Sequence, residues 1–249
     1  MKTGIKKIKT ETEKHQLRYR VNCTNKDKRD EFMKIAKVKT HMLSQKIIAN
    51  VTEEFARVYH LPEGHKSVAF FSTDNDDVGY LAVDDATKKA NIKLIHAGTY
   101  YGGSICSWSK YGGSVFILFS GPKVEDVRSG LRYVKDFIDN QSALCNFDGD
   151  PGTTFYAQTI PRVGKYFQEW CEIRPEESYA YLVGGPIETN YALDKALKAG
   201  DTRIVRYWYP PSHANSSGAV VAGTESACRA ATRAFIEALE YATKNPMEM

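Results

Sequence analysis

Hydrophobic and polar positions follow one order that occurs twice along the chain. In the first copy, the apolar run SVAFF (67–71) precedes a helical pattern, and the apolar runs NIKLIHA (91–97) and SVFILFSGP (114–122) follow it. In the second copy, SYAYL, TNYALDKALKAG, DTRIVRYWY and GAVVAGTES repeat this order. Short apolar runs bounded by turn residues predict strands, and apolar residues spaced by three and four predict amphipathic helices.

The two copies superpose with an offset of about 110 residues, which predicts a tandem repeat. The offset places Asp84 on Asp194 and Lys88 on Lys198. Each copy is preceded by a strand and a short helix, in residues 46–61 and 157–173. The chain therefore predicts an α+β fold in which each unit is a mostly antiparallel sheet with helices packed on one face.

The repeat divides the chain into four segments. We expect a basic N-terminal extension in 1–42, a first domain in 43–140, a polar linker in 141–153 and a second domain in 154–249. Residues 1–40 hold 13 Lys and Arg against 5 Asp and Glu, whereas the rest of the chain holds 21 against 25. The extension is either a solvated arm or an arm that docks on an acidic partner surface.

Composition indicates a reduced, cytoplasmic globular protein. Hydrophobic residues make up 42% and charged residues 26% of the chain, and no apolar run is long enough to span a bilayer. The basic start has no apolar core of the kind that a secretory signal needs. The five cysteines form no CxxC pair, and none of the six histidines has zinc-site spacing, so we expect neither metal nor cofactor.

Acidic side chains crowd the region after the first apolar run. A calcium loop of EF-hand type fits poorly, because Val78 would occupy a ligand position and Asp85 would replace the bidentate glutamate. A haloacid-dehalogenase-like phosphatase, with Asp74 as nucleophile and Asp76 as acid and base, is the enzymatic alternative, but that chemistry needs a parallel sheet. The five aspartates are Asp74, Asp76, Asp77, Asp84 and Asp85.

The structural explanation gives these carboxylates ordinary roles. Asp76 or Asp77 is expected to cap the helix that starts near Val78. Asp84 and Asp85 are expected to pair with Lys88 and Lys89 on a solvated helix face. Asp74 is expected to shape the turn.

The two units differ most in the hairpin loop between their last two strands. The first loop, TYYGGSICSWSKYGGS (99–114), contains YGGS twice, and the second, YPPSHANSSG (209–218), is rich in proline and serine. Loops on a rigid scaffold often carry function.

These motifs, together with STDNDDVGYLAVDDATKKA, YLVGGPIETNYALDKALKAGDTRIV and PPSHANSSGAVVAGTESACRAA, resemble a known family. The chain is similar to the tandem-domain trimeric shell proteins of bacterial microcompartments, of the EutL-like (ethanolamine utilisation) and EtuB-like (ethanol utilisation) kinds, over residues 43–247. The resemblance implies two circularly permuted shell domains and a non-enzymatic homotrimer that forms a pseudo-hexameric tile. It also implies contacts with other shell proteins edge to edge and with lumenal enzymes, and no binding to nucleic acid or membrane.

The resemblance further implies a gated central pore through which small metabolites or cofactors pass. The first hairpin loop matches the family's pore loop, and one cysteine per chain at this position would allow a rival use, an iron–sulfur cluster on the three-fold axis. The residues that match the pore loop are Tyr101, Gly102, Gly103, Ser104, Cys106, Tyr111, Gly112 and Gly113.

A narrower channel within each subunit is also implied, with Asp76 and Asp77 in its wall. Ser212, His213 and Asn215 of the second loop match its other side. Two carboxylates on a channel wall favour an ammonium group and repel anions. EutL-like proteins have SETN where this chain has SHAN, so one negative charge is lost and a neutral permeant such as ethanol or acetaldehyde is favoured.

Overall fold

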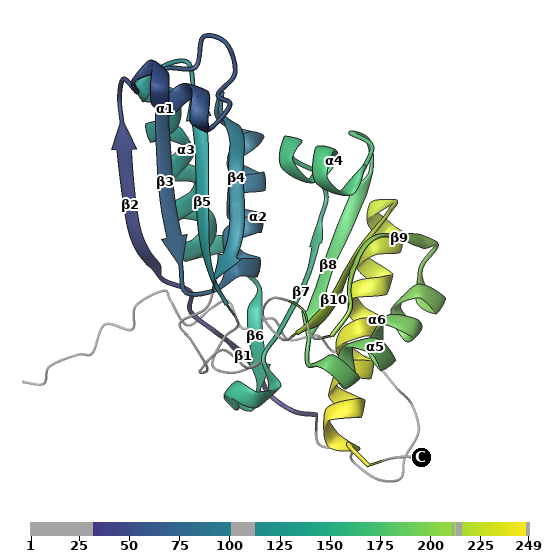
Figure 1. The fold of residues 1–249 in the computed structure, drawn as a ribbon. Coiled ribbons are helices and arrows are strands. Elements are labelled where there is room, and N and C mark those ends of the chain that lie inside the picture. The colour runs from purple at the N-terminus through teal and green to yellow at the C-terminus, as the bar shows by residue number, and fades with distance from the viewer. Residues whose placement is uncertain (1–31, 101–112, 211, 213–215, 248–249) are drawn as a thin grey trace, which may run out of the picture. The chain divides into compact units, whose positions relative to one another are not determined.

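The computed structural model describes residues 32–100, 113–210, 212 and 216–247, and these residues form two antiparallel sheets. The first sheet has the order β2-β3-β5-β4, as Figure 1 shows. Its strands are β2 (Met42–Ile48), β3 (Ser67–Thr73), β4 (Lys93–Tyr100) and β5 (Ser114–Gly121). The second sheet has the order β1-β6-β7-β8-β10-β9. Its strands are β1 (Ile35–Lys37), β6 (Leu144–Phe147), β7 (Phe155–Ile160), β8 (Ser178–Gly184), β9 (Thr202–Trp208) and β10 (Ser217–Gly223).

The strand order confirms the repeat. The order β2-β3-β5-β4 in the first sheet recurs as β7-β8-β10-β9 in the second, and every paired strand is antiparallel. In each unit the last two strands form a hairpin, and the second strand lies between the first and the fourth. The expected α+β fold of antiparallel sheets with helices is therefore confirmed.

Two short strands extend the second sheet beyond the repeat. β1 pairs with β6, and β6 pairs with β7. They lie in the segments that we expected to be the N-terminal extension and the linker. Both segments form strands because Val38 and Leu144 are buried, and the Val38 amide donates a 2.8 Å hydrogen bond to the Leu144 carbonyl. Runs of three and four residues are too short to show a periodic pattern in the sequence.

Two long helices cover one face of each sheet (Figure 1). The first sheet carries α2 (Asp76–Thr87) and α3 (Val124–Asp136), and the second carries α5 (Pro186–Ala199) and α6 (Glu225–Lys244). Alanines at the contact between α5 and α6, including Ala192, Ala196 and Ala231, are buried and allow the two helices to approach closely. The shorter elements are α1 (Glu53–Val58), α4 (Lys165–Cys171), a π-helical turn (Phe137–Gln141) and a 3-10 turn (Pro151–Thr153).

One apolar cluster joins the two domains. It contains Phe71 and Leu81 of the first domain together with Phe167 of α4 and Tyr179 and Tyr181 of β8. The tyrosines lie on the face of the second sheet opposite to α5 and α6, because they alternate along β8 with Ala180 and Leu182 of a separate cluster. α2 therefore packs between its own sheet and the open face of the second sheet. Among the described helices, none is long and apolar enough to cross a membrane.

Candidate functional site

The site lies at the amino end of α2, directly after β3. α2 begins at Asp76, and its N-cap is Asn75, whose side chain accepts a 2.9 Å hydrogen bond from the Val78 amide. The expected capping by Asp76 or Asp77 is therefore wrong. The helix begins two residues earlier than expected, so both carboxylates belong to its first turn, where the helix dipole favours negative charge.

Asp76 holds the base of the first hairpin. Its carboxylate accepts a 2.8 Å hydrogen bond from the Thr99 hydroxyl near the end of β4 and another from the Gly113 amide just before β5. The Tyr80 hydroxyl lies 2.8 Å from the same Thr99 oxygen. One buried side chain on α2 thus contacts Thr99 and Gly113, the residues that flank the segment 100–112.

Asp77 points to the other domain. The Tyr181 hydroxyl of β8 donates a 2.7 Å hydrogen bond to its carboxylate. Both residues are buried, and the bond crosses the boundary between the two domains. Asp77 therefore links the first turn of α2 to the open face of the second sheet.

Burial makes both carboxyl groups hold protons more strongly than usual. Loss of hydration raises the pKa of Asp76 to about 6, although the hydrogen bonds from Thr99 and the nearby amides lower it. The pKa of Asp77 is raised well above its ordinary value, first by burial and then by the negative charge of Asp76. The ion pairs of the described residues include neither carboxylate. The pair is consequently less negative near neutral pH than two exposed aspartates.

Asp84 does not lie on a solvated helix face, so that expectation is wrong. Its side chain is 0% exposed and accepts hydrogen bonds from the amides of Gly164 (2.9 Å) and Phe167 (3.0 Å) and from the Tyr179 hydroxyl (3.1 Å). Lys88 lies 3.5 Å away, as the spacing predicted. Asp84 thus satisfies the amino end of α4 in the other domain, where the N-cap Gly164 has no side chain for this purpose.

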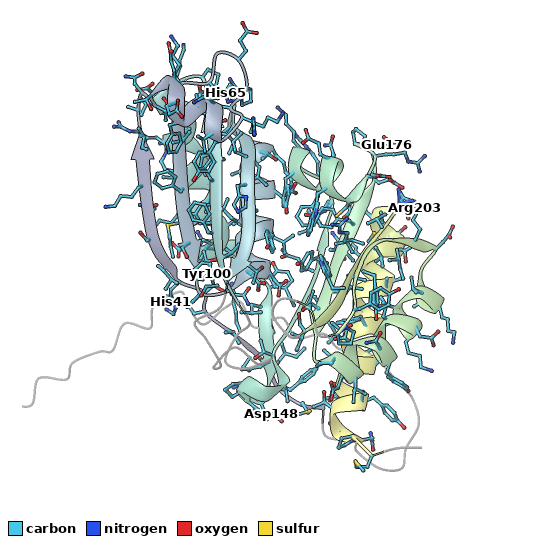
Figure 2. All side chains as sticks on the ribbon, in the orientation of Figure 1. His41, His65, Tyr100, Asp148, Glu176 and Arg203 are labelled. Atoms are coloured by element: carbon cyan, nitrogen blue, oxygen red, sulfur yellow. The ribbon has the colours of Figure 1, made fainter. Side chains whose placement is uncertain are left out.

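The two remaining aspartates have local partners. Asp85 is also buried rather than solvated, and it forms the expected pair with Lys89 at 2.6 Å. Asp74 accepts hydrogen bonds from the amide and the ring of His41 at 2.7 and 2.8 Å, so it ties the turn after β3 to the chain before β2. Figure 2 labels His41 beside this turn. An attacking Asp74 on a parallel sheet, as the phosphatase alternative requires, does not fit these antiparallel sheets, and the described residues hold no cluster of metal ligands.

The other expected site residues are only partly described. Gly113 is buried beside Asp76, and the Ser212 hydroxyl lies 3.0 Å from that of Ser216, where it helps to close the loop between β9 and β10. The sequence did not indicate Tyr80, Thr99 or Tyr181 as partners of the carboxylates, although the alternation of tyrosines along 179–181 signals a shared face. Outside the described residues lie Tyr101, Gly102, Gly103, Ser104, Cys106, Tyr111, Gly112, His213 and Asn215.

A cavity of about 680 Å³ lies at the opposite end of α2. Its walls include Thr87 of α2, Ile95 and His96 of the edge strand β4, and Lys165 and Trp170 of α4. A helix of 12 residues is roughly 18 Å long, so the Asp76 and Asp77 side chains do not line this cavity.

Two tandem α+β domains share one strand order and meet across an apolar cluster that also encloses buried carboxylates. Comparison with known proteins places this architecture in the class of bacterial microcompartment shell proteins. The BMC domain family matches residues 67–147. The shell protein EutL of Clostridium perfringens (strain 13 / Type A) is 40% identical over 215 residues, which are 86% of this chain and 99% of that protein. A crystal structure of EutL from Leptotrichia buccalis C-1013-b matches with a TM-score of 0.80 at 38% identity and covers 86% of this chain and 99% of that one.

The chain therefore belongs to the EutL family of bacterial microcompartment shell proteins. As a member of this family it is a component of the shell of a bacterial microcompartment in the cytoplasm. EtuB from Clostridium kluyveri, with a TM-score of 0.70 at 18% identity over 88% of this chain and 95% of that one, shares the fold alone.

Proposed function

We propose that the protein is a structural tile of a microcompartment shell of the ethanolamine- or ethanol-utilisation type. Three copies form a pseudo-hexameric ring from six domains, each chain contributing residues 43–140 and 154–249. The identity of 40% to a EutL protein supports the ethanolamine type. The tile meets other shell proteins edge to edge, with lumenal enzymes as further partners.

One observation supports the proposed homotrimer. α2 of the first domain covers the open face of the second sheet, whereas α5, its counterpart in the repeat, has an exposed outer face. The open face of the first sheet likewise keeps the half-buried rings of Phe70 and Phe116. Within the described residues, each chain thus has one uncovered helix face and one uncovered sheet face. Such head-to-tail surfaces form a ring when the rotation closes, and the tandem repeat makes three chains equivalent to six domains.

The loops between the last two strands of each domain surround the central pore in this proposal. They occupy the same place in both copies of the repeat, so a ring brings all six to one axis. The pore loop comprises residues 101–113, and it gates the passage of small metabolites or cofactors.

The narrower channel passes Asp76 and Asp77 in this proposal, with Ser212, His213 and Asn215 opposite. The permeant is a neutral molecule such as ethanol or acetaldehyde. Support comes from the raised pKa values of both carboxyl groups and from their bonds to Thr99 and Tyr181, which leave little free charge for an ammonium group. Calorimetry with ethanolamine tests this: heat of binding that Asp77→Asn abolishes would contradict a neutral permeant.

The test of the tile is the mass of the assembly. Sedimentation or native mass spectrometry is expected to give three times the chain mass of 28.0 kDa, and electron microscopy is expected to show sheets or tubes. A monomer at micromolar concentration would contradict the proposal. A structural tile has no turnover, so magnesium-dependent hydrolysis of p-nitrophenyl phosphate that Asp74→Asn abolishes would favour the phosphatase instead.

A further inference from the structure

The outer face of α5 carries an apolar side chain, Ile187, that belongs to neither apolar cluster of the described residues. Ile187 is 79% exposed, and Asp194 and Lys198 lie further along the same helix, also exposed. The equivalent residues of α2, at the offset that superposes Asp84 on Asp194, are Asp77, Asp84 and Lys88. Asp77 and Asp84 bond to the second domain, and Lys88 lies 3.5 Å from Asp84 with only 12% of its side chain exposed.

The surface that receives α2 also has a counterpart. β8 and β3 are the equivalent strands of the repeat, each of seven residues, and aligning their starts places Tyr181 on Phe70. Phe70 is half-buried, and its ring lies 6.4 Å from that of Phe116. Neither ring belongs to the apolar core between the first sheet and its helices, whereas the alternate residue Phe71 does. Phe70 and Phe116 therefore form an aromatic patch on the open face of the first sheet.

The amino ends of α4 and of its counterpart α1 differ, and the difference changes which side chains fit against them. A Cβ on Gly164 would overlap the Asp84 carbonyl oxygen, so the close approach of α2 to α4 requires glycine. The counterpart of Gly164 in α1 is Thr52, which has a side chain and already caps its own helix by accepting from the Phe55 amide. The first turn of α1 carries Glu53 and Glu54, whose negative charges repel another carboxylate and attract a lysine.

We infer that, in the proposed ring, Ile187 of one copy packs on Phe70 and Phe116 of the next, and Lys198 faces Glu53 at the start of that copy's α1. The contact between copies is then apolar where the contact within the chain is the Asp77–Tyr181 hydrogen bond. This inference rests on the proposed homotrimer and names the residues that hold it together.

The experiment compares the assembly of four proteins by sedimentation across a concentration series. Ile187→Asp places a carboxylate against Phe70 and is expected to weaken assembly at least tenfold. Adding Phe70→Tyr recreates the Asp and Tyr pair of the inner boundary, so the double variant is expected to recover assembly at least in part. Met247→Asp, at an apolar position that is 88% exposed beyond α6, is the matched control and is expected to assemble normally.

The outcomes separate the two ideas. A monomeric wild type overturns the proposed tile. A trimeric wild type with an Ile187→Asp variant that assembles equally well overturns only the inferred contact. Circular dichroism identifies any variant that does not fold, and Lys198→Glu then serves as the second probe. It is expected to weaken assembly, and Glu53→Lys in the same chain is expected to restore it; no effect of Lys198→Glu overturns the charged part of the contact.

Discussion

The Tyr181 hydroxyl donates a 2.7 Å hydrogen bond to the Asp77 carboxylate across the boundary between the two domains. The two residues belong to different repeat units, and 104 positions separate them in the chain. The bond fixes the first turn of α2 against the open face of the second sheet. A buried acceptor that loses its donor is costly, so this contact is sensitive to small changes.

Replacing Tyr181 by phenylalanine tests the bond. Tyr181→Phe keeps the ring but removes the donor, and we expect the free energy of unfolding to fall by about 1–3 kcal/mol. Urea unfolding at a fixed protein concentration measures it. Tyr100→Phe is the control, because the Tyr100 hydroxyl bonds to Ser72 at a residue that is 44% exposed. An equal loss of unfolding free energy in both variants would show that the buried Tyr181–Asp77 bond stabilises the protein no more than an exposed bond does.

The pH dependence of stability tests the carboxylate pair. The pKa of Asp76 is raised from 3.8 to about 6 in the folded protein, so the folded state binds more protons than the unfolded state between these values. Stability is therefore expected to fall as the pH rises from about 4 to about 7, by up to about 3 kcal/mol.

Asp76→Asn isolates this contribution. The amide oxygen can still accept from Thr99, but the group no longer ionises, and the pKa of Asp77 is expected to fall toward its ordinary value. Unfolding curves at pH 5 and pH 8 should therefore show the variant gaining stability relative to the wild type at the higher pH. Parallel pH profiles for the two proteins would contradict the raised pKa.

Asp84 is expected to be the most costly of the five aspartates to remove. Asp84→Ala leaves two backbone amides and the Tyr179 hydroxyl without their acceptor, so we expect a loss of roughly 3 kcal/mol or more in urea unfolding. Asp139→Ala, which removes the exposed helix pair with Lys135, is expected to change stability by less than about 0.5 kcal/mol. A similar small effect at Asp84 would refute its cross-domain role.

Gly164, the N-cap of α4, is also expected to tolerate substitution poorly. Gly164→Ala places a methyl group against the Asp84 carbonyl and carboxylate, and the resulting overlap is expected to cost about 1–3 kcal/mol. In Gly152→Ala the nearest atom to the new Cβ is the Asp150 carboxylate at 3.3 Å, so this control is expected to be nearly neutral. Thermal unfolding of both variants provides the comparison.

The aspartates show how far sequence reasoning reaches in this chain. The spacing of four correctly predicted the pairs of Asp84 with Lys88 and of Asp85 with Lys89. It also indicated a solvated face, which is wrong, because periodicity reports which residues share a helix face but not what covers that face. The second unit was misleading here, since Asp194 and Lys198 form the same pair on an exposed surface.

The sequence by itself determined the repeat, the order of helices and strands in both units, the antiparallel α+β architecture and the family. Local patterns of apolar residues encode these features, because each strand and helix buries one of its faces and so shows its own periodicity. Only the tertiary structure decided that β1 and β6 join the second sheet and that Asp76, Asp77 and Asp84 are buried. Those features depend on contacts such as Asp77 with Tyr181 and Asp84 with Gly164, which join buried residues 80 to 104 positions apart in the chain.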